Sequence, residues 1–239
     1  MLDIRRQAGV HMLTLARPQR GNALCTELVE AMLVGVDEAR ADADVHTLVL
    51  RGEGRHFCTG FDLGDLDSAS DGDLLHRMVR IEGLLSALWH APFRTLAVAT
   101  GRTWGAGADL FAACDLRAAT ADANFRFPGA GFGLVLGTRR LAERIGTDAA
   151  RRTVCEGLAL DAGSAQEQGL VSQVVVDVQA WIDSASRPPA VDRETLAQLH
   201  RATRKDCADS DLAALVRSAA RPGLKARIAA YRARLHPNT

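Results

Sequence analysis

Strand-like and helical segments alternate along the first two thirds of the chain, and this alternation restricts the fold more than any other feature. Residues 45–50 and 95–99 are runs of strand length that are rich in aliphatic residues. Apolar residues recur at three- and four-residue spacing in 74–88, as on one face of a helix. Strands separated by helices can pair in parallel, so the pattern predicts an α/β fold.

Further elements follow from the same patterns. We expect strands at 11–16, 116–119 and 170–176, a helix capped by Thr26, and short helices at 138–145, 148–156 and 163–168. The sequence Arg187-Pro188-Pro189 marks a boundary, because prolines interrupt regular structure. Beyond it, 193–235 lacks any strand signal and is interrupted at Pro222-Gly223, so we expect appended helices there. We therefore predict a core at residues 1–187 and a helical region at 188–239.

Charge and cysteine content exclude several classes of protein. The 239 residues include 29 basic and 29 acidic side chains, a balance that argues against a nucleic acid or an anionic membrane as partner. No apolar run reaches the roughly 20 residues of a membrane helix, and the first residues lack a secretion signal. The five cysteines form no Cys-x-x-Cys pair, so we expect buried thiols, no metal site and a cytoplasmic location.

The glycine-rich places do not match the common nucleotide-binding or hydrolase motifs. Gly105-Ala106-Gly107 and Gly129-Ala130-Gly131 begin like a dinucleotide fingerprint, but the sixth positions are Leu110 and Leu134. The sequence contains neither a Gly-x-Ser-x-Gly elbow nor a Gly-x-x-x-x-Gly-Lys loop. The seven histidines show no His-x-x-x-His spacing.

Two bends carry the first positive signal. A β-like run ends in Thr59-Gly60-Phe61-Asp62, and Trp104-Gly105-Ala106-Gly107 opens directly into a helix. Backbone N–H groups can point outward at both places, the second of them at a helix N-terminus. If the bends lie side by side, they form a pair of donors for one oxygen. The alternative is that both are tight turns that use glycine for steric reasons.

Four motifs, in order, resemble the enoyl-CoA hydratase/isomerase (crotonase) family. They are LARPQRGNAL at 15–24, FCTGFDL at 57–63, GAGADL at 105–110 followed by ACD at 113–115, and SAQEQGLV at 164–171. The resemblance extends from about the third residue to about the 180th, and the separations between motifs are similar to those of the family.

The resemblance implies a fold, a ligand and an assembly. It implies a crotonase-like spiral of ββα units with a C-terminal helical region used in trimer contacts, hence a homotrimer or a dimer of trimers. It also implies an acyl-CoA thioester as substrate, with coenzyme A as part of that substrate, and a role in fatty acid metabolism. By position, the N–H groups of Phe61 and Ala106 would form an oxyanion hole, each worth about 3 kcal/mol in the transition state.

The same resemblance implies where coenzyme A would bind. The residues at the matching positions are Ala23, Leu24, Arg55, Thr59, Gly60, Asp62 and Leu63. Arg55 lies where many members carry a phosphate-contacting lysine, although a solvated arginine is an equal alternative. Asp62 and Asp115 lie at positions where the family carries structural carboxylates. Phe61, Trp104, Phe127 and Phe132 could line the acyl pocket or belong to the core.

Two departures from the family pattern concern the chemistry. Hydratases of the family use two glutamates, and the first falls on Asp109, a carboxylate withdrawn by one methylene. The second falls on Gly129, so that carboxylate is absent, and the glycine loop at 131–137 is shorter than usual. We therefore expect double-bond isomerisation, decarboxylation or slow hydration by Asp109 alone, or a non-catalytic acyl-CoA binder. Asp109 could instead be satisfied by the helix dipole.

Overall fold

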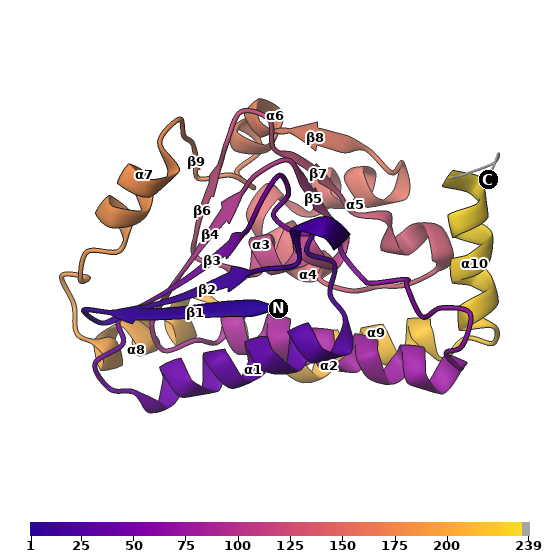
Figure 1. Ribbon diagram of the computed structural model, residues 1–239, viewed down its shortest axis with the longest axis horizontal. Coiled ribbons are helices and arrows are strands. Elements are labelled where there is room, and N and C mark those ends of the chain that lie inside the picture. The colour runs from indigo at the N-terminus through magenta and orange to yellow at the C-terminus, as the bar shows by residue number, and fades with distance from the viewer. Residues whose placement is uncertain (236–239) are drawn as a thin grey trace.

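A six-stranded sheet forms the centre of the computed structural model, which describes residues 1–235 (Figure 1). The strand order is β1-β2-β3-β4-β6-β9; β1 and β2 pair antiparallel, and the other neighbours are parallel. The strands are β1 (Leu2–Gln7), β2 (Val10–Leu15), β3 (Thr47–Gly52), β4 (Arg94–Ala99), β6 (Leu116–Ala119) and β9 (Gln173–Val174). The α/β prediction is confirmed.

Both faces of this sheet are covered, as its apolar strands require. Side chains alternate along β4: Ala97 and Ala99 join the larger core, whereas Leu96 and Val98 join a smaller cluster on the other face. The larger core is closed by α1 (Thr26–Ala41), α2 (Asp71–Trp89) and α3 (Ala106–Ala113). On the opposite face, α7 (Val178–Ala185) contributes Ile182 to the smaller cluster.

A second sheet of three short strands lies beside the first. Its order is β5 (Arg102–Trp104), β7 (Asn124–Arg126) and β8 (Ala159–Asp161). The chain thus passes through β4, β5 and α3, and then through β6, β7 and α4 (Thr138–Ile145), which is the expected succession of ββα units. The other short elements are η1 (Pro18–Arg20), η2 (Pro128–Phe132), α5 (Thr147–Cys155) and α6 (Ala162–Glu167).

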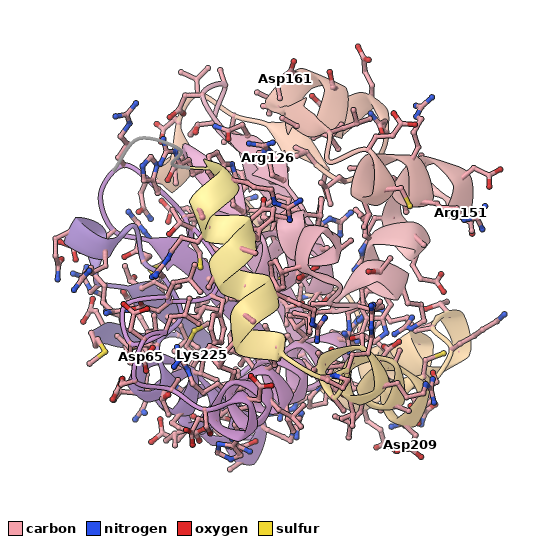
Figure 2. The ribbon with its side chains drawn as sticks, turned by 90° about the vertical axis from the view of Figure 1, so that its right-hand side faces the viewer. Asp65, Arg126, Arg151, Asp161, Asp209 and Lys225 are labelled. Atoms are coloured by element: carbon pink, nitrogen blue, oxygen red, sulfur yellow. The ribbon has the colours of Figure 1, made fainter. Side chains whose placement is uncertain are left out.

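The last three helices pack against the core. They are α8 (Arg193–Thr203), α9 (Ala208–Ala219) and α10 (Leu224–Leu235). Figure 2 shows α10 crossing one face of the molecule, between the segments that carry Asp65 and Arg126. The backbone N–H groups of Leu224 and Lys225 donate to Asp71 at the start of α2, at 3.0 and 2.7 Å. The division at residue 187 stays a prediction. Residues 236–239 of the predicted C-terminal helical region lie outside the described part of the chain.

Some expected details were wrong. Thr26 is the first residue of α1, and Cys25 occupies the cap position without a capping side-chain bond. The strand expected at 170–176 pairs only at Gln173 and Val174, because the chain turns after leaving α6. Cys155 ends α5 on the solvent side and is exposed, whereas Cys58 and Cys114 are buried.

Candidate active site

A parallel bridge holds the first bend. Leu24 pairs with Phe61: its N–H donates to the Gly60 carbonyl at 2.8 Å, and its carbonyl accepts the Asp62 N–H at 3.1 Å. Phe61 lies between Gly60 and Asp62, and in a parallel bridge the N–H of such a residue points away from the partner segment. Gly60 has a φ of +98°, a conformation that glycine adopts without strain. The chain therefore turns the Phe61 N–H away from Leu24.

The second bend is the start of α3. Gly105 lies outside the helix with φ +53° and donates its N–H to Arg126 in β7 at 2.8 Å. Ala106 is the first helical residue, so its N–H has no partner within the helix. Among residues 1–235, neither this N–H nor that of Phe61 donates a hydrogen bond to a protein acceptor.

The two bends lie in contact. A Cβ atom placed on Gly60 would lie 2.8 Å from the Trp104 carbonyl oxygen and 3.5 Å from the Ala106 nitrogen. A Cβ on Gly107 would lie 2.4 Å from the Cys58 carbonyl oxygen, so the first turn of α3 packs directly on the chain before the first bend. The two bends therefore lie side by side, which the sequence alone left as a condition.

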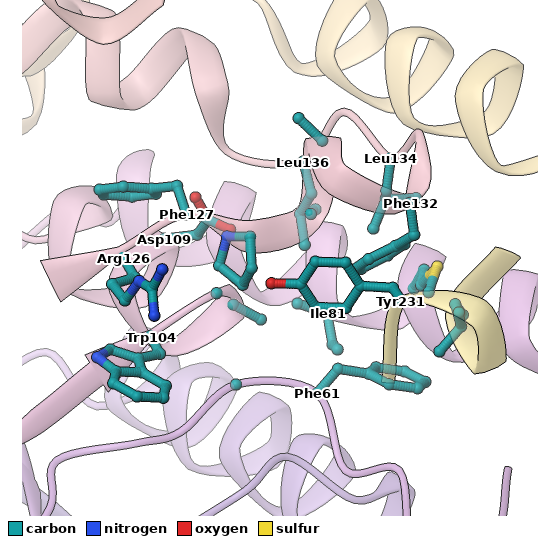
Figure 3. Close-up of a pocket in the computed structure, with 18 of the residues that line it drawn as sticks. Phe61, Ile81, Trp104, Asp109, Arg126, Phe127, Phe132, Leu134, Leu136 and Tyr231 are labelled. Carbon is teal, nitrogen blue, oxygen red and sulfur yellow. The ribbon is translucent and has the colours of Figure 1, made fainter. Parts of the chain in front are cut away.

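A cavity of about 430 Å³ opens at the two bends (Figure 3). Apolar side chains from the first bend, α2, the loop around η2, and α10 line most of it: Phe61, Leu63, Met78, Ile81, Phe127, Phe132, Leu134, Leu136, Ile228 and Tyr231. All four aromatic residues named from the sequence, Phe61, Trp104, Phe127 and Phe132, face this cavity. Its size and apolar lining suit a small organic group.

Asp109 is the only carboxylate among the described residues that line the cavity. It is 4% exposed, and its Oδ1 has no hydrogen-bond partner in residues 1–235. Desolvation raises the pKa of Asp109 well above its ordinary value; Arg140 opposes this rise and Glu82 adds to it. Gly137 allows the carboxyl to lie there, since a Cβ on Gly137 would overlap it.

Behind Asp109 lies a buried ion pair that sequence analysis missed. Arg140 in α4 is fully buried, and it donates to both carboxylate oxygens of Glu82 in α2, at 2.7 and 3.1 Å. Burial raises the pKa of Glu82 although Arg140 opposes this. Neither residue lines the cavity. The pair joins α4 to α2, and its two charges act in opposite directions on the pKa of Asp109.

The residues expected to hold coenzyme A are only partly brought together. Thr59, Gly60 and Leu63 line the cavity. Ala23 and Leu24 are buried beside the first bend, and exposed Arg55 does not reach the cavity.

Asp62 is held by an ion pair. It accepts from Arg17 at 2.9 Å and from the Gly64 N–H at 2.9 Å. Desolvation opposes ionisation, but the Gly64 N–H and Arg17 hold the pKa of Asp62 below its ordinary value. This environment fits the structural carboxylate expected at this position.

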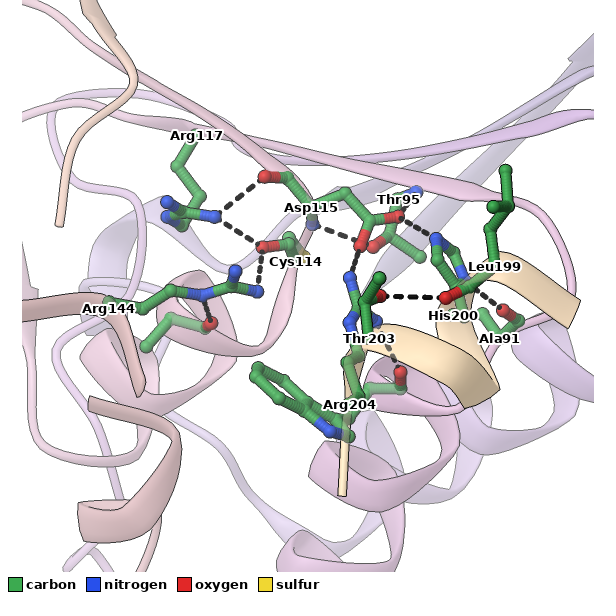
Figure 4. A network of polar contacts seen from close by, with 12 residues as sticks. Ala91, Thr95, Cys114, Asp115, Arg117, Arg144, Leu199, His200, Thr203 and Arg204 are labelled. Atoms are coloured by element: carbon green, nitrogen blue, oxygen red, sulfur yellow. Dashed lines mark hydrogen bonds and ion pairs between the residues drawn. The ribbon is translucent and has the colours of Figure 1, made fainter. Parts of the chain in front are cut away.

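The C-terminal end of α3 is fixed by arginines (Figure 4). The Cys114 carbonyl accepts from Arg117 at 2.8 Å and from Arg144 at 2.9 Å, and positive charges are favourable at a helix C-terminus. Asp115 is ion-paired with Arg204, the residue that follows α8, and accepts the Thr95 N–H at 2.8 Å. These contacts hold in place the helix whose other end carries the Ala106 N–H.

Comparison with known proteins decides the family. The model of the enoyl-CoA hydratase/isomerase family matches residues 5–218. The chain belongs to the enoyl-CoA hydratase/isomerase family. A Mycobacterium leprae protein named "Probable enoyl-CoA hydratase echA6" is 35% identical over 190 residues, covering 76% of this chain and 74% of that protein.

Solved structures of the enoyl-CoA hydratase/isomerase family confirm the crotonase-like fold. One from Bordetella parapertussis is 49% identical, with a TM-score of 0.94 and coverage of 97% of this chain and 98% of the other. One from Xanthobacter autotrophicus is 28% identical, with a TM-score of 0.83 and coverage of 98% and 97%. In residues 1–235 we find no helix long and apolar enough to cross a membrane. The same residues hold no cluster of ligating side chains suited to a metal ion.

Proposed function

We propose that the protein is an acyl-CoA enzyme of the enoyl-CoA hydratase/isomerase type that stabilises a thioester enolate. The N–H groups of Phe61 and Ala106 would donate to the thioester oxygen as it gains negative charge. The observation that carries the proposal is that two unpaired N–H groups, on bends in contact, open into the same cavity as an unpartnered carboxyl. That cavity is apolar enough to hold an acyl chain.

Double-bond isomerisation suits a single carboxylate best. Asp109 would take a proton from the α-carbon, and the electron pair of the broken C–H bond would form the enolate. The same proton would then pass from Asp109 to the γ-carbon while the double bond shifts into conjugation, so no atom is gained or lost. A raised pKa makes the Asp109 carboxylate a stronger base for the first step.

A non-catalytic acyl-CoA binder is the second candidate, and Gly129 favours it. Gly129 lies in η2 on the cavity wall, where the family's second glutamate would be, and supplies no side chain. The hydration mechanism that uses two carboxylates would therefore lack its second carboxylate in this cavity. Decarboxylation, which needs mainly the enolate site, stays an alternative within the first candidate.

Coenzyme A itself would lie along the first bend. We assign to it Ala23, Leu24, Arg55, Thr59, Gly60, Asp62 and Leu63, with Asp62 acting through Arg17. The support is that the bridge between Leu24 and Phe61 joins these segments next to the cavity mouth. A cytoplasmic homotrimer or dimer of trimers belongs to the same proposal, and light scattering of the purified protein would test the assembly.

The test uses the ultraviolet absorbance of conjugated enoyl thioesters. A 3-enoyl-CoA mixed with the wild type should gain this absorbance, and Asp109→Asn should abolish the gain. Asp209→Asn makes the same chemical change on an exposed position of α9 and should leave the rate unchanged. Tight acyl-CoA binding without turnover of enoyl-, malonyl- or hydroxyacyl-CoA would support the binder instead. Absence of acyl-CoA binding would refute both candidates.

A further inference from the structure

Tyr231 forms part of the far wall of the cavity. It lies on α10, more than 90 positions after η2 in sequence, and lines the same cavity as Asp109. Figure 3 shows its ring reaching across the cavity, with the hydroxyl oxygen directed towards the side on which Asp109 lies. It is the only tyrosine in the chain. Sequence analysis did not single it out.

Packing fixes the position of the Tyr231 ring. The ring meets Phe132 edge-on, with centroids 5.4 Å apart. A Cβ on Gly131 would lie 2.8 Å from Cε2 of the tyrosine, so this loop leaves room for the ring only because it carries glycine. Arg227 donates to the Phe132 carbonyl at 2.7 Å, and Arg234 donates to the Gly131 carbonyl at 3.1 Å. These bonds fasten α10 to η2.

The Tyr231 hydroxyl has no protein partner for a hydrogen bond in residues 1–235. The neighbouring lining is mostly apolar, with Ile81, Leu134 and Ile228 among the side chains around the same cavity. A plain hydrocarbon chain that filled this space would displace water and leave the hydroxyl unpaired, which is unfavourable. A ligand that carries an oxygen atom next to the Tyr231 hydroxyl would accept its hydrogen bond.

We propose that Tyr231 determines substrate specificity by donating its hydroxyl to an oxygen on the acyl chain beyond the α-carbon. The substrate class is then an oxygenated acyl-CoA, with a hydroxyl or carbonyl oxygen on the chain, rather than a plain fatty acyl-CoA. The inference rests on the proposed function, because it needs an acyl group in this cavity. It does not require Tyr231 to take part in the proton transfer.

The experiment compares two kinds of ligand on two proteins. The ligands are hexanoyl-CoA and a series of hydroxyhexanoyl-CoA thioesters with the hydroxyl at carbon 3, 4 or 5, and calorimetry gives each dissociation constant. We expect the wild type to prefer one hydroxylated ligand by about fivefold or more, as one hydrogen bond gives. Tyr231→Phe keeps the ring and its contact with Phe132, and should lose that preference while binding hexanoyl-CoA as tightly as before.

The outcomes separate the inference from the proposed function. If hexanoyl-CoA binds but no hydroxylated ligand is preferred by the wild type, the role of Tyr231 is wrong and the acyl-CoA site stands. The role is equally wrong if Tyr231→Phe keeps the preference. A general packing defect in the variant would weaken both ligands alike and leave their ratio unchanged, which also overturns it. If no acyl-CoA binds to the wild type, the proposed function fails.

Discussion

Gly60→Ala tests the contact between the two bends by adding a single carbon atom. That atom would lie 2.8 Å from the Trp104 carbonyl oxygen, whereas ordinary contacts of this kind begin at 3.4 Å. Because the obstacle is backbone, one bend must move by about 0.6 Å, more than the roughly 0.5 Å that a catalytic arrangement tolerates. The Phe61 and Ala106 N–H groups would then no longer converge on one oxygen.

The expected loss of kcat is the loss caused by removing one oxyanion donor. Turnover of the best enoyl-CoA substrate should fall by about 10²-fold to 10³-fold in kcat. The dissociation constant of a saturated acyl-CoA should change much less, since the donors act mainly on the charged intermediate. Alanine at a φ of +98° should also lower the free energy of unfolding, by about 1–3 kcal/mol.

Gly83→Ala is the matched control. Gly83 lies inside α2, and a Cβ there would meet nothing within 4 Å. The change should raise the free energy of unfolding by about 0.5–1 kcal/mol and leave kcat unchanged. Gly60→Ala can be measured in this more stable background, which keeps the protein folded. Wild-type kcat in a folded Gly60→Ala protein would refute the oxyanion-hole assignment.

Three further predictions concern the charged groups of the site. Gly129→Glu should increase the rate of hydration of a 2-enoyl-CoA, measured by the loss of its absorbance. The side chain can be accommodated because a Cβ at Gly129 meets Leu134 only at ordinary distances of 3.6 Å or more. An unchanged rate would show that this position does not face the acyl group. Asp109→Asn should raise the urea midpoint of unfolding more at pH 8 than at pH 4. Because the pKa of Asp109 is raised in the folded state, this residue destabilises the wild type increasingly as the pH rises above its unfolded pKa. An equal difference in midpoint at both pH values would contradict this. Arg140→Met should lower the free energy of unfolding by about 3–5 kcal/mol in a denaturant titration, because Glu82 is left buried without its partner. Adding Glu82→Gln to this variant should recover part of that loss.

The large elements could be predicted from sequence because their apolar spacing is local. The strand at 95–99 and the helix at 138–145 occur where hydrophobic periodicity places them. The three strands of the second sheet were missed, since each has only three residues and depends on partners far away in the chain. Trp104, for example, pairs with Arg126, and Phe125 pairs with Leu160. No local pattern encodes such pairings.

Some residues of the site could likewise be predicted from the sequence, and others could not. Phe61, Ala106 and Asp109 could be named because family motifs carry them at fixed positions, and the structure brings all three to one cavity. Tyr231 and the Arg140–Glu82 pair depend on how helices distant in sequence meet. A single tyrosine in an arginine-rich helix was visible in the sequence, but nothing there placed it opposite the bends.

The fastening of α10 over the cavity affects when the protein becomes functional during its synthesis. The lining begins at Thr59 and ends at Tyr231, so the wall stays open on the ribosome until α10 has been translated. At about 5–20 residues per second, roughly ten to thirty seconds separate those two residues. A nascent chain would therefore expose Phe61, Ile81 and Phe132 until α10 is made, and chaperones that bind apolar surface would meet the unfinished pocket before any ligand could.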